Sequence, residues 1–391
     1  SSDVCSSDLV QVTESTTDKM EPVHLDKKPE VVRVLIGRDK YKHDIYWEFG
    51  NKALANRHLL ITGTSGQGKT YSIQTMLYEL ARCDISSVIF DYTEGFMLQQ
   101  LEPPFKESLD GKIVQKIVYS TGVPINPFKR HEVDLAGMKI LEKESDVAAR
   151  LSDIFSHVYD FGAQQNAAIF EAAYNGLVKY GDNMNIRKFQ QELEEVAEIN
   201  KAANTVISKM TPFFRTVDFT EDPEFDWENI LYNDEGKVNI IQLTLFSREM
   251  QVIITEMMLW DAWYYTKKFG SKDKPFVVVL DEAQNLSHTI KSPSAAILTE
   301  GRKFGWSAWF ATQSLKILKD DEVVRLLQAS FKLYFKPTDD EMTKISKQID
   351  VTGDGNWLSV IQGLQKGQCI VVGDRMLANG KVGADRKSTR L

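Results

Sequence analysis

Residues 58–70, His-Leu-Leu-Ile-Thr-Gly-Thr-Ser-Gly-Gln-Gly-Lys-Thr, decide the fold of this chain of 391 residues. The first six form an apolar run that ends in glycine, which is typical of a buried strand. Residues 70–83 have apolar side chains at helical spacing, and 86–92 are a second apolar, strand-like run. A strand, a glycine-rich turn, a helix and a second strand predict a βαβ unit, whose crossover requires a parallel sheet covered on both faces.

The turn between the first strand and the helix matches the phosphate-binding pattern G-x-x-x-x-G-K-[ST]. Its glycines let backbone N–H groups converge on phosphate oxygens without obstruction by a Cβ atom, and the helix N-terminus adds partial positive charge. Lys69 is expected to hold the β- and γ-phosphates, and Thr70 to ligate Mg²⁺. The predicted nucleotide site consists of Gly63, Thr64, Ser65, Gly66, Gln67, Gly68, Lys69 and Thr70.

A second motif, residues 276–282 (Phe-Val-Val-Val-Leu-Asp-Glu), is an apolar strand that ends in two carboxylates. This order is typical of a Walker B element, in which Asp281 would hold the Mg²⁺ shell and Glu282 would orient the attacking water or accept its proton. Since adjacent strand residues point to opposite faces, the two carboxylates are expected not to repel each other across one site. By itself the motif is weak evidence for a Walker B element. The presence of the phosphate-binding loop in the same chain makes this interpretation the favoured one.

Two further polar residues end apolar strands at the edge where ligands bind in open α/β sheets. Gln313 ends the run 307–313, and its amide is expected either to contact the γ-phosphate and report hydrolysis or only to cap the strand. Asp91 ends the run 86–92 and is either a neighbour of the metal site or a strand terminator.

Residues 300–305, Glu-Gly-Arg-Lys-Phe-Gly, lie between the carboxylate strand and the Gln313 strand. Two adjacent cations beside glycines could bind an anion or provide an arginine, Arg302, to a neighbouring subunit. Composition alone favours a solvated basic turn. Other candidate cations are expected to be solvated surface residues: Lys129, Arg130, Lys267 and Lys268.

Composition and charge indicate an ordinary globular protein. The chain is 42% hydrophobic and 26% charged, which excludes wholesale disorder and a fibrous repeat. A formal net charge of −8 argues against a surface coated with phosphate-neutralising charge, although a locally basic channel is compatible with it. Cys5, Cys83 and Cys369 suit neither a metal site nor a disulfide framework, so reduced thiols are expected. Without a long apolar run or a signal-peptide pattern, we expect a cytoplasmic protein with no membrane contact.

The order of the patterns predicts an α/β fold, with a mostly parallel sheet interrupted by a helical insertion. Residues 1–30 and 381–391 are polar and are expected to be a disordered or non-native lead-in and a disordered tail. The core is expected over 31–140 and 236–380, and the insertion over 141–235. Further strands are expected near 31–37, 45–49, 112–120, 238–243, 331–335 and 368–373.

Five strings, taken together, carry a resemblance to a known family: GTSGQGKT, INPF (125–128), VVVLDEAQNL, EGRKFGW and ATQ. They resemble the FtsK/HerA superfamily of hexameric P-loop motors, nearer to the HerA branch, over about residues 31–375. The P-loop and the following FDYTEGF strand are further similar to the ATPase portion of DptH-type proteins of DNA phosphorothioation-dependent restriction. The resemblance implies a RecA-like core, ATP and Mg²⁺, a homo-hexameric ring, translocation on duplex DNA and a nuclease partner. It also implies that Arg302 acts in trans.

One departure from that family concerns the start of the chain. HerA has a small β-barrel before its ATPase core, whereas about thirty residues precede Val31 here. Either the chain is part of a longer polypeptide, or its ring contacts differ.

Two other functions stay open. One is an ATPase motor that acts on protein or conjugative substrates, which stimulation by DNA would distinguish. The other is an ATP-dependent switch or scaffold, but such a protein would need neither Glu282 nor Gln313 at these strand ends. A GTP switch is not expected, because no N-K-x-D string follows the P-loop.

Overall fold

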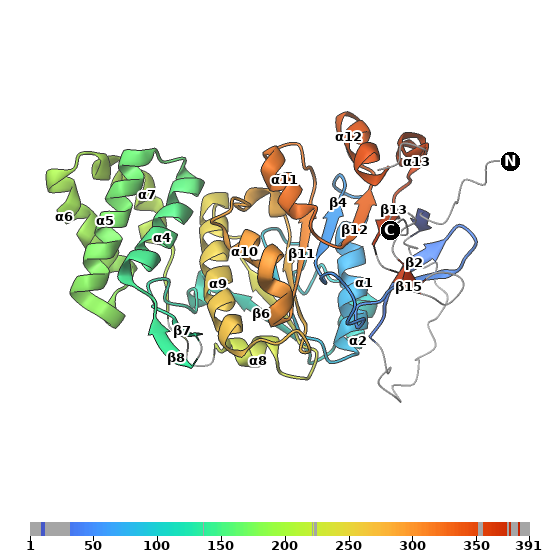
Figure 1. The fold of residues 1–391 in the computed structure, drawn as a ribbon, viewed down its shortest axis with the longest axis horizontal. Helices are drawn as coiled ribbons and strands as arrows, with labels where there is room; N and C mark the ends of the chain where they lie inside the picture. The colour runs from blue at the N-terminus through green and yellow to red at the C-terminus, as the bar shows by residue number, and fades with distance from the viewer. Residues whose placement is uncertain are drawn as a thin grey trace.

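The computed structural model describes residues 9–11, 32–135, 137–220, 222, 225–350, 355–373, 375–376 and 382–383. Figure 1 shows a bundle of helices at one end, a long helix beside it, a central sheet, and a helix on the far side of the sheet. The fold is therefore α/β, as predicted.

The sheet has the strand order β15-β14-β3-β2-β1-β13-β12-β4-β11-β10-β5-β9-β6. All neighbours from β12 to β6 are parallel, so their carboxyl ends meet at one edge. These strands are β4 (Leu59–Thr62), β5 (Ser87–Asp91), β6 (Ile113–Ile117), β9 (Val238–Gln242), β10 (Phe276–Leu280), β11 (Trp306–Thr312) and β12 (Phe331–Phe335).

An antiparallel group extends the sheet beyond β12. It consists of β13 (Gln368–Val372), β1 (Leu9–Gln11), β2 (Val34–Asp39), β3 (Asp44–Trp47), β14 (Arg375–Met376) and β15 (Val382–Gly383). The predicted lead-in and tail thus contain two short strands: β1, which pairs with β2 and β13, and β15, which ends the sheet beside β14. The rest of those two segments, including Cys5, lies outside the described residues.

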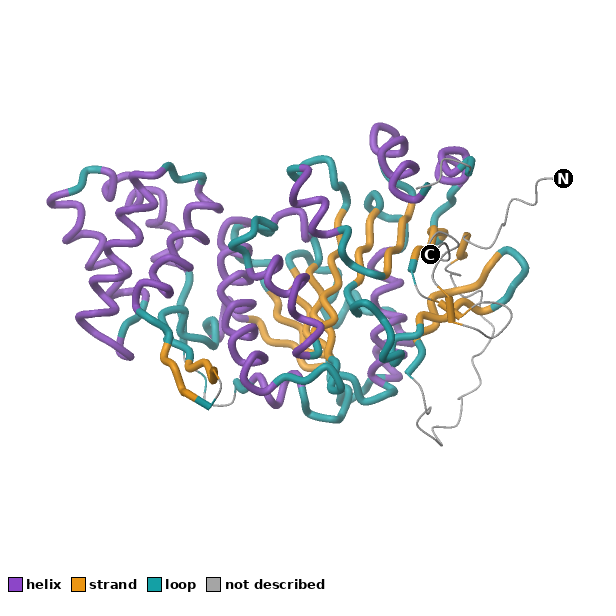
Figure 2. The backbone as a smooth tube through the Cα atoms, viewed as in Figure 1, coloured by secondary structure: helices purple, strands orange, loops and turns teal. Residues whose placement is uncertain are grey.

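Alternate residues of the parallel strands face two different cores, since successive strand side chains point to opposite faces. Leu59 and Ile61 pack with α1 (Lys69–Ala81) and α2 (Pro103–Ser108), whereas Leu60 packs on the side of α9 (Arg248–Phe269). Burial of both faces is expected for a parallel sheet. Figure 2 shows helices on both sides of these strands. The predicted apolar face of α1 is buried through Ile73, Leu77 and Leu80.

The helical bundle consists of α4 (Glu144–Tyr159), α5 (Ala163–Tyr180), α6 (Ile186–Ile199) and α7 (Ala202–Thr216). Phe155 stacks on Phe189 and meets Phe213 edge to face in its centre. The core of the bundle is continuous with the core on the α9 side of the sheet. The predicted helical insertion is therefore present and packs on the α9 side of the sheet.

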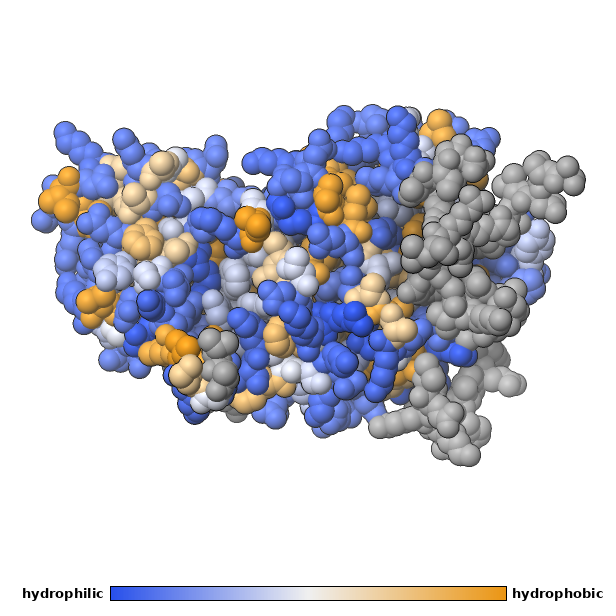
Figure 3. Space-filling model, in the orientation of Figure 1, coloured by the Kyte–Doolittle hydropathy of each residue, from blue (hydrophilic) through white to orange (hydrophobic). Residues whose placement is uncertain are grey.

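A hairpin of β7 (Glu132–Leu135) and β8 (Met138–Leu141) precedes the bundle, and the sequence did not indicate it. Every residue of β8 is exposed, so no alternation of buried and exposed residues marks the strand. Figure 3 shows a mainly hydrophilic face with small apolar patches, and exposed apolar residues of the hairpin include Met138 and Ile140.

Shorter helices join the remaining elements. They are α3 (Val118–Thr121), α8 (Trp227–Leu231), α10 (Pro293–Glu300), α11 (Asp320–Leu326), α12 (Asp339–Ile349) and α13 (Trp357–Gly363), with 3-10 turns η1 (Gly181–Asn183), η2 (Ala283–Asn285) and η3 (Gly301–Phe304). Within the described residues, no helix combines the length and the apolar character that a membrane crossing would require.

Candidate functional site

The P-loop connects the end of β4 to the start of α1. Gly63, Gly66 and Gly68 have φ values of 147°, 77° and 107°, which favour glycine over residues with a side chain. A Cβ atom on Gly63 would lie 2.5 Å from the Cβ of Phe335 in β12, so glycine lets the loop pass close to the neighbouring strand. A Cβ atom on Gly66 would meet nothing within 4 Å, which leaves this backbone open to a ligand.

Lys69 is the first residue of α1 and folds back over the loop. Its Nζ donates to the carbonyl oxygens of Gly63 at 2.7 Å and Thr64 at 3.1 Å. Burial lowers the pKa of Lys69, and the charges of Asp281 and Glu282 oppose that shift. The ammonium group is thus held beside the P-loop backbone, where phosphate oxygens can take the place of these carbonyl acceptors.

Asp281 and Glu282 follow β10 directly, as predicted. Asp281 is only 9% exposed, and burial raises its pKa to about 6, with Glu282 as the second cause. The expectation that strand geometry keeps the two carboxylates from interacting is therefore wrong. The strand ends at Leu280, and Glu282 has a left-handed backbone with φ 52°, so the alternation of a strand does not apply to this pair.

Gln313 follows the end of β11 and is directed at the Walker B glutamate. Its Nε2 donates to Oε1 of Glu282 at 2.6 Å, and Nε2 of Gln284 donates to the other oxygen, Oε2. Both carboxylate oxygens therefore have an amide donor. The structure brings Gln313 to the predicted site, while its contact with a γ-phosphate stays a prediction.

These groups share one cavity of about 640 Å³ at the carboxyl edge of the parallel strands. Sequence reasoning missed several of its residues, among them Lys366 and Gly367 from the loop before β13. The Gly367 N–H donates to the Gln67 carbonyl at 3.0 Å, which brings this distant loop onto the P-loop. The cavity is lined by Ser65, Gly66, Gly68, Lys69, Thr70, Tyr71, Thr93, Glu102, Asp281, Glu282, Gln313, Lys366 and Gly367.

The donors in this cavity suit a magnesium–nucleotide complex. Mg²⁺ usually binds through one or two protein oxygens together with substrate phosphates and water. Thr70 and Asp281 supply a hydroxyl and a carboxylate to the cavity that Lys69 also lines. In the described part of the chain, no group of three or more His, Cys, Asp and Glu side chains could hold a metal by itself.

Asp91 is fully buried at the end of β5, and its carboxylate organises the next loop. It accepts hydrogen bonds from the N–H groups of Thr93 at 3.1 Å and Phe96 at 3.0 Å, and from Nε2 of Gln242 at 2.7 Å. Burial raises its pKa, which these hydrogen bonds oppose. Of the two interpretations, the structure favours a strand-end residue that positions the loop carrying Thr93.

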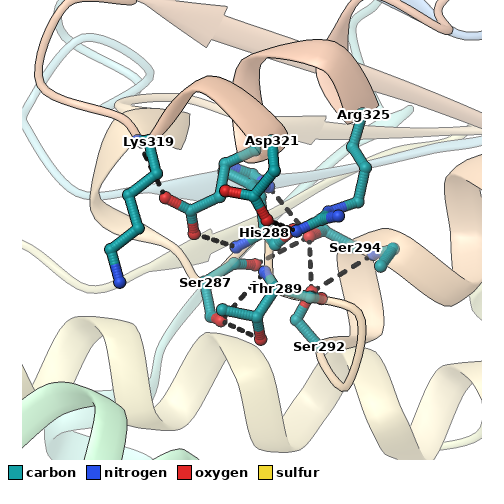
Figure 4. Close-up of polar contacts among 10 residues, drawn as sticks. Ser287, His288, Thr289, Ser292, Ser294, Lys319, Asp321 and Arg325 are labelled. Atoms are coloured by element: carbon teal, nitrogen blue, oxygen red, sulfur yellow. Dashed lines mark hydrogen bonds and ion pairs between the residues drawn. The ribbon is translucent and has the colours of Figure 1, made fainter.

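A buried polar cluster around His288 fixes the turn that follows Glu282 (Figure 4). His288 Nε2 lies 2.7 Å from the Ala283 carbonyl and Nδ1 lies 2.8 Å from Ser294 Oγ in α10. Burial lowers the pKa of His288 to about 4, so the ring is neutral at pH 7. Because a carbonyl only accepts, Nε2 carries the hydrogen.

The same cluster ties this turn to α11. The His288 N–H donates to Glu322 at 3.2 Å, and Arg325 Nε donates to the His288 carbonyl. The backbone around the Walker B turn is thus anchored to both α10 and α11.

Arg302 lies in η3, which precedes β11 at the amino edge of the parallel strands. It lines a small cleft with Arg57, Lys52 and Asp273 and does not line the P-loop cavity. Burial lowers the pKa of Arg57, and the charge of Arg302 is the second cause. The structure therefore does not bring Arg302 to the nucleotide site of its own chain, and it places a second arginine, which sequence reasoning missed, beside it.

Glycine at position 305 allows the turn that follows Arg302 to pack against the loop before β10. Its φ is 89°, and a Cβ atom there would lie 2.4 Å from the Lys274 carbonyl oxygen. The turn after Arg302 therefore packs closely on the loop that precedes β10.

The strand order and the P-loop cavity define a RecA-like P-loop NTPase core. The same fold occurs in VirB4 of Thermoanaerobacter pseudethanolicus, with a TM-score of 0.64 and 14% identity over 91% of this chain and 98% of that one. It also occurs in the bacterial conjugative coupling protein TrwBΔN70, with a TM-score of 0.54 and 15% identity over 83% of this chain and 77% of that one. At these identities, the similarity concerns the fold.

Residues 36–262, more than half of the chain, match the family model described as the central domain of helicase HerA. The chain belongs to this family. It is also 23% identical over 340 residues to the DNA double-strand break repair helicase HerA of Sulfurisphaera tokodaii. That match covers 81% of this chain and 62% of the relative, so this chain spans less than two thirds of it.

Proposed function

We propose that the chain is an ATP-driven motor that moves along DNA as a homo-oligomeric, hexameric ring. The observation that carries this proposal is the convergence of Lys69, Thr70, Asp281, Glu282 and Gln313 on one cavity. Residues 31–140 and 236–380 would form the motor core, and 141–235 would form an insertion.

The proposed catalytic residues would each have a distinct role in ATP hydrolysis. The P-loop backbone and Lys69 would bind the phosphate chain, and Thr70 and Asp281 would hold Mg²⁺. When bound, Mg²⁺ neutralises charge on the phosphates. Glu282 orients water and accepts its proton, while the Gln313 amide turns from Glu282 to the γ-phosphate. A structure of TrwB with a non-hydrolysable ATP analogue, with a TM-score of 0.51 to this chain, supports ATP as the ligand.

Arg302 would complete the site of a neighbouring subunit. The support for this role is its position at the amino edge of the strands, beside Arg57 and outside the cavity of its own chain. An arginine supplied in trans stabilises charge that develops on the γ-phosphate, so hydrolysis would depend on assembly.

The family and the DNA repair helicase named above favour DNA as the track. A net charge of −8 for the whole chain is compatible with a locally basic pore. Duplex DNA, a nuclease partner and a DptH-type role in restriction of foreign DNA are the more specific parts of the proposal. The fold similarity to VirB4 and to a conjugative coupling protein favours a second candidate, a motor for protein or conjugative substrates.

The test is the rate of ATP hydrolysis with and without duplex DNA, combined with the particle mass with and without ATP. We expect stimulation by duplex DNA and an ATP-dependent ring. Hydrolysis that DNA does not change would favour the second candidate. ATP binding without hydrolysis under any of these conditions would contradict a motor function and indicate a switch or scaffold.

A further inference from the structure

The carboxylate of Glu282 is held by two amides that differ in their place in the fold. Gln313 lines the nucleotide cavity, whereas Gln284 lies in the turn η2, two residues after Glu282, and is not part of the cavity lining. Oε1 accepts from Gln313 and Oε2 accepts from Gln284. The two oxygens of one carboxylate are thus held by two different amides, only one of which lines the cavity.

The orientation of the Gln284 amide, with Nε2 toward Glu282, leaves its own oxygen without a partner in the described part of the chain. Its own Oε1 is buried and has no hydrogen-bond partner among the described residues. A buried acceptor without a partner is unfavourable, and each such group in a folded protein needs an explanation. Since the Glu282 carboxylate only accepts, Nε2 must face it, and the hydrogen bond to a charged group offsets the unpaired oxygen.

The backbone on which both side chains stand is fixed. Glu282 has the left-handed φ of 52°, and His288 holds the carbonyl of the next residue, Ala283, at 2.7 Å. The remaining freedom of Glu282 is therefore rotation of its side chain. A donor on one oxygen removes most of that freedom.

We propose that Gln284 is the positioning residue of Glu282: it anchors Oε2 throughout the cycle and leaves Oε1 to be exchanged between Gln313 and the attacking water. The oxygens of a γ-phosphate can compete for the Gln313 amide inside the cavity. Gln284 does not line this cavity, so its hydrogen bond to Oε2 is expected to persist when nucleotide binds. This inference rests on the proposed hydrolysis of ATP but not on the identity of the track.

The test compares side chains of similar length at position 284. Gln284→Met keeps the length and loses the donor, so kcat is expected to fall about 10-fold to 100-fold, with ATP affinity within about twofold of the parent. Gln284→His restores an N–H donor at a similar reach and is expected to recover at least about fivefold over Gln284→Met. If Gln284 had only a structural role, kcat would not fall from the parent to Gln284→His and further to Gln284→Met while the ATP affinity stayed constant.

The matched control is Gln348→Met in α12. Gln348 is also partly buried, and its Oε1 also has no hydrogen-bond partner among the described residues, but it does not line the cavity. Its kcat is expected to equal that of the parent.

Three results would overturn the assignment of Gln284. They are a kcat of Gln284→Met equal to or above the parent, a loss of ATP binding in that variant, and no recovery in Gln284→His. In each case the parent still hydrolyses ATP, so the proposed function stands. A parent chain that binds ATP and never hydrolyses it would overturn the proposed function and this inference together.

Discussion

The two edges of the parallel sheet differ in the side chains that they bring together. At the carboxyl edge, Lys69, Asp281, Glu282 and Gln313 converge on one cavity and contact one another or the P-loop backbone. At the amino edge, Arg57 and Arg302 lie together in a small cleft, and their like charges oppose each other. One edge holds most of the proposed catalytic residues, and the other holds two cations that do not line the cavity.

The distance between the edges explains why the arginines cannot serve their own nucleotide. The strand β11 has seven residues, and at about 3.3 Å per residue its ends lie about 20 Å apart. Arg302 precedes one end and Gln313 follows the other. Cations at the amino edge therefore lie far from the P-loop cavity of their own chain, and in the proposed ring they would act on a neighbouring chain.

The largest expected effect comes from removing the amino-edge cation. Arg302→Ala should bind ATP and lose about 10³-fold to 10⁵-fold in kcat, because a trans arginine stabilises charge only in the transition state. Nucleotide binding and steady-state hydrolysis measure the two quantities. Lys303→Ala, which removes the adjacent exposed cation, is the control and should retain the parent rate.

A mixing experiment tests whether the amino edge of one chain serves the carboxyl edge of another. Lys69→Ala chains can still donate Arg302, so mixing them with Arg302→Ala chains should restore part of the hydrolysis at mixed interfaces. Full activity of a demonstrated monomer would show instead that Arg302 is a solvated turn residue.

At the carboxyl edge, Glu282→Gln should lower kcat by about 10²-fold to 10⁴-fold while ATP and Mg²⁺ stay bound. The amide keeps the shape of the side chain and loses the group that accepts a proton from water. Equilibrium binding and single-turnover hydrolysis are the measurements. Loss of binding would mean that Asp281 and Glu282 have been assigned the wrong roles.

Lys69→Ala should lower ATP turnover by about 10²-fold to 10³-fold, since one positive donor to the phosphates is lost. The fold should persist, because burial already disfavours this ammonium group, as its lowered pKa indicates. Thermal unfolding of the variant tests that second point. Near-parent hydrolysis in a folded variant would contradict the role of the P-loop.

The smallest expected effect is on stability at the amino edge. Arg57 Nε donates to the Phe49 carbonyl at 2.8 Å and Nη1 donates to the Lys272 carbonyl at 3.2 Å. Arg57→Ala should therefore lower the free energy of unfolding by about 1 to 3 kcal/mol. Urea denaturation measures this, with the exposed Lys52→Ala as control. An unchanged midpoint would mean that the two hydrogen bonds do not support the cleft.

The sequence predicted the parts of the fold and site that depend on short motifs. The P-loop, the two carboxylates after β10 and Gln313 after β11 were found because spacing and strand patterns place them at one edge. Lys366 and Arg57 carry no local signature, since their roles depend on which distant segments the fold brings together. Gln284 lies only two residues after Glu282, but its contact with the carboxylate depends on the left-handed turn between them. The hairpin β7–β8 was missed because β8 has no buried face. The left-handed turn at Glu282 was missed because an apolar run does not show where its strand ends.

The position of β4 in the sheet has a consequence for synthesis of the chain. Its two partners, β11 and β12, begin at Trp306 and Phe331, and the P-loop itself is held by the carbonyl groups of Thr312 and Lys336. The ribosome must therefore add more than 240 residues after Thr62 before this strand finds its neighbours, which takes about 10 to 50 s at typical rates. During that time the nascent chain displays an apolar strand with unpaired backbone, a surface that chaperones recognise, and nucleotide cannot yet assist its folding.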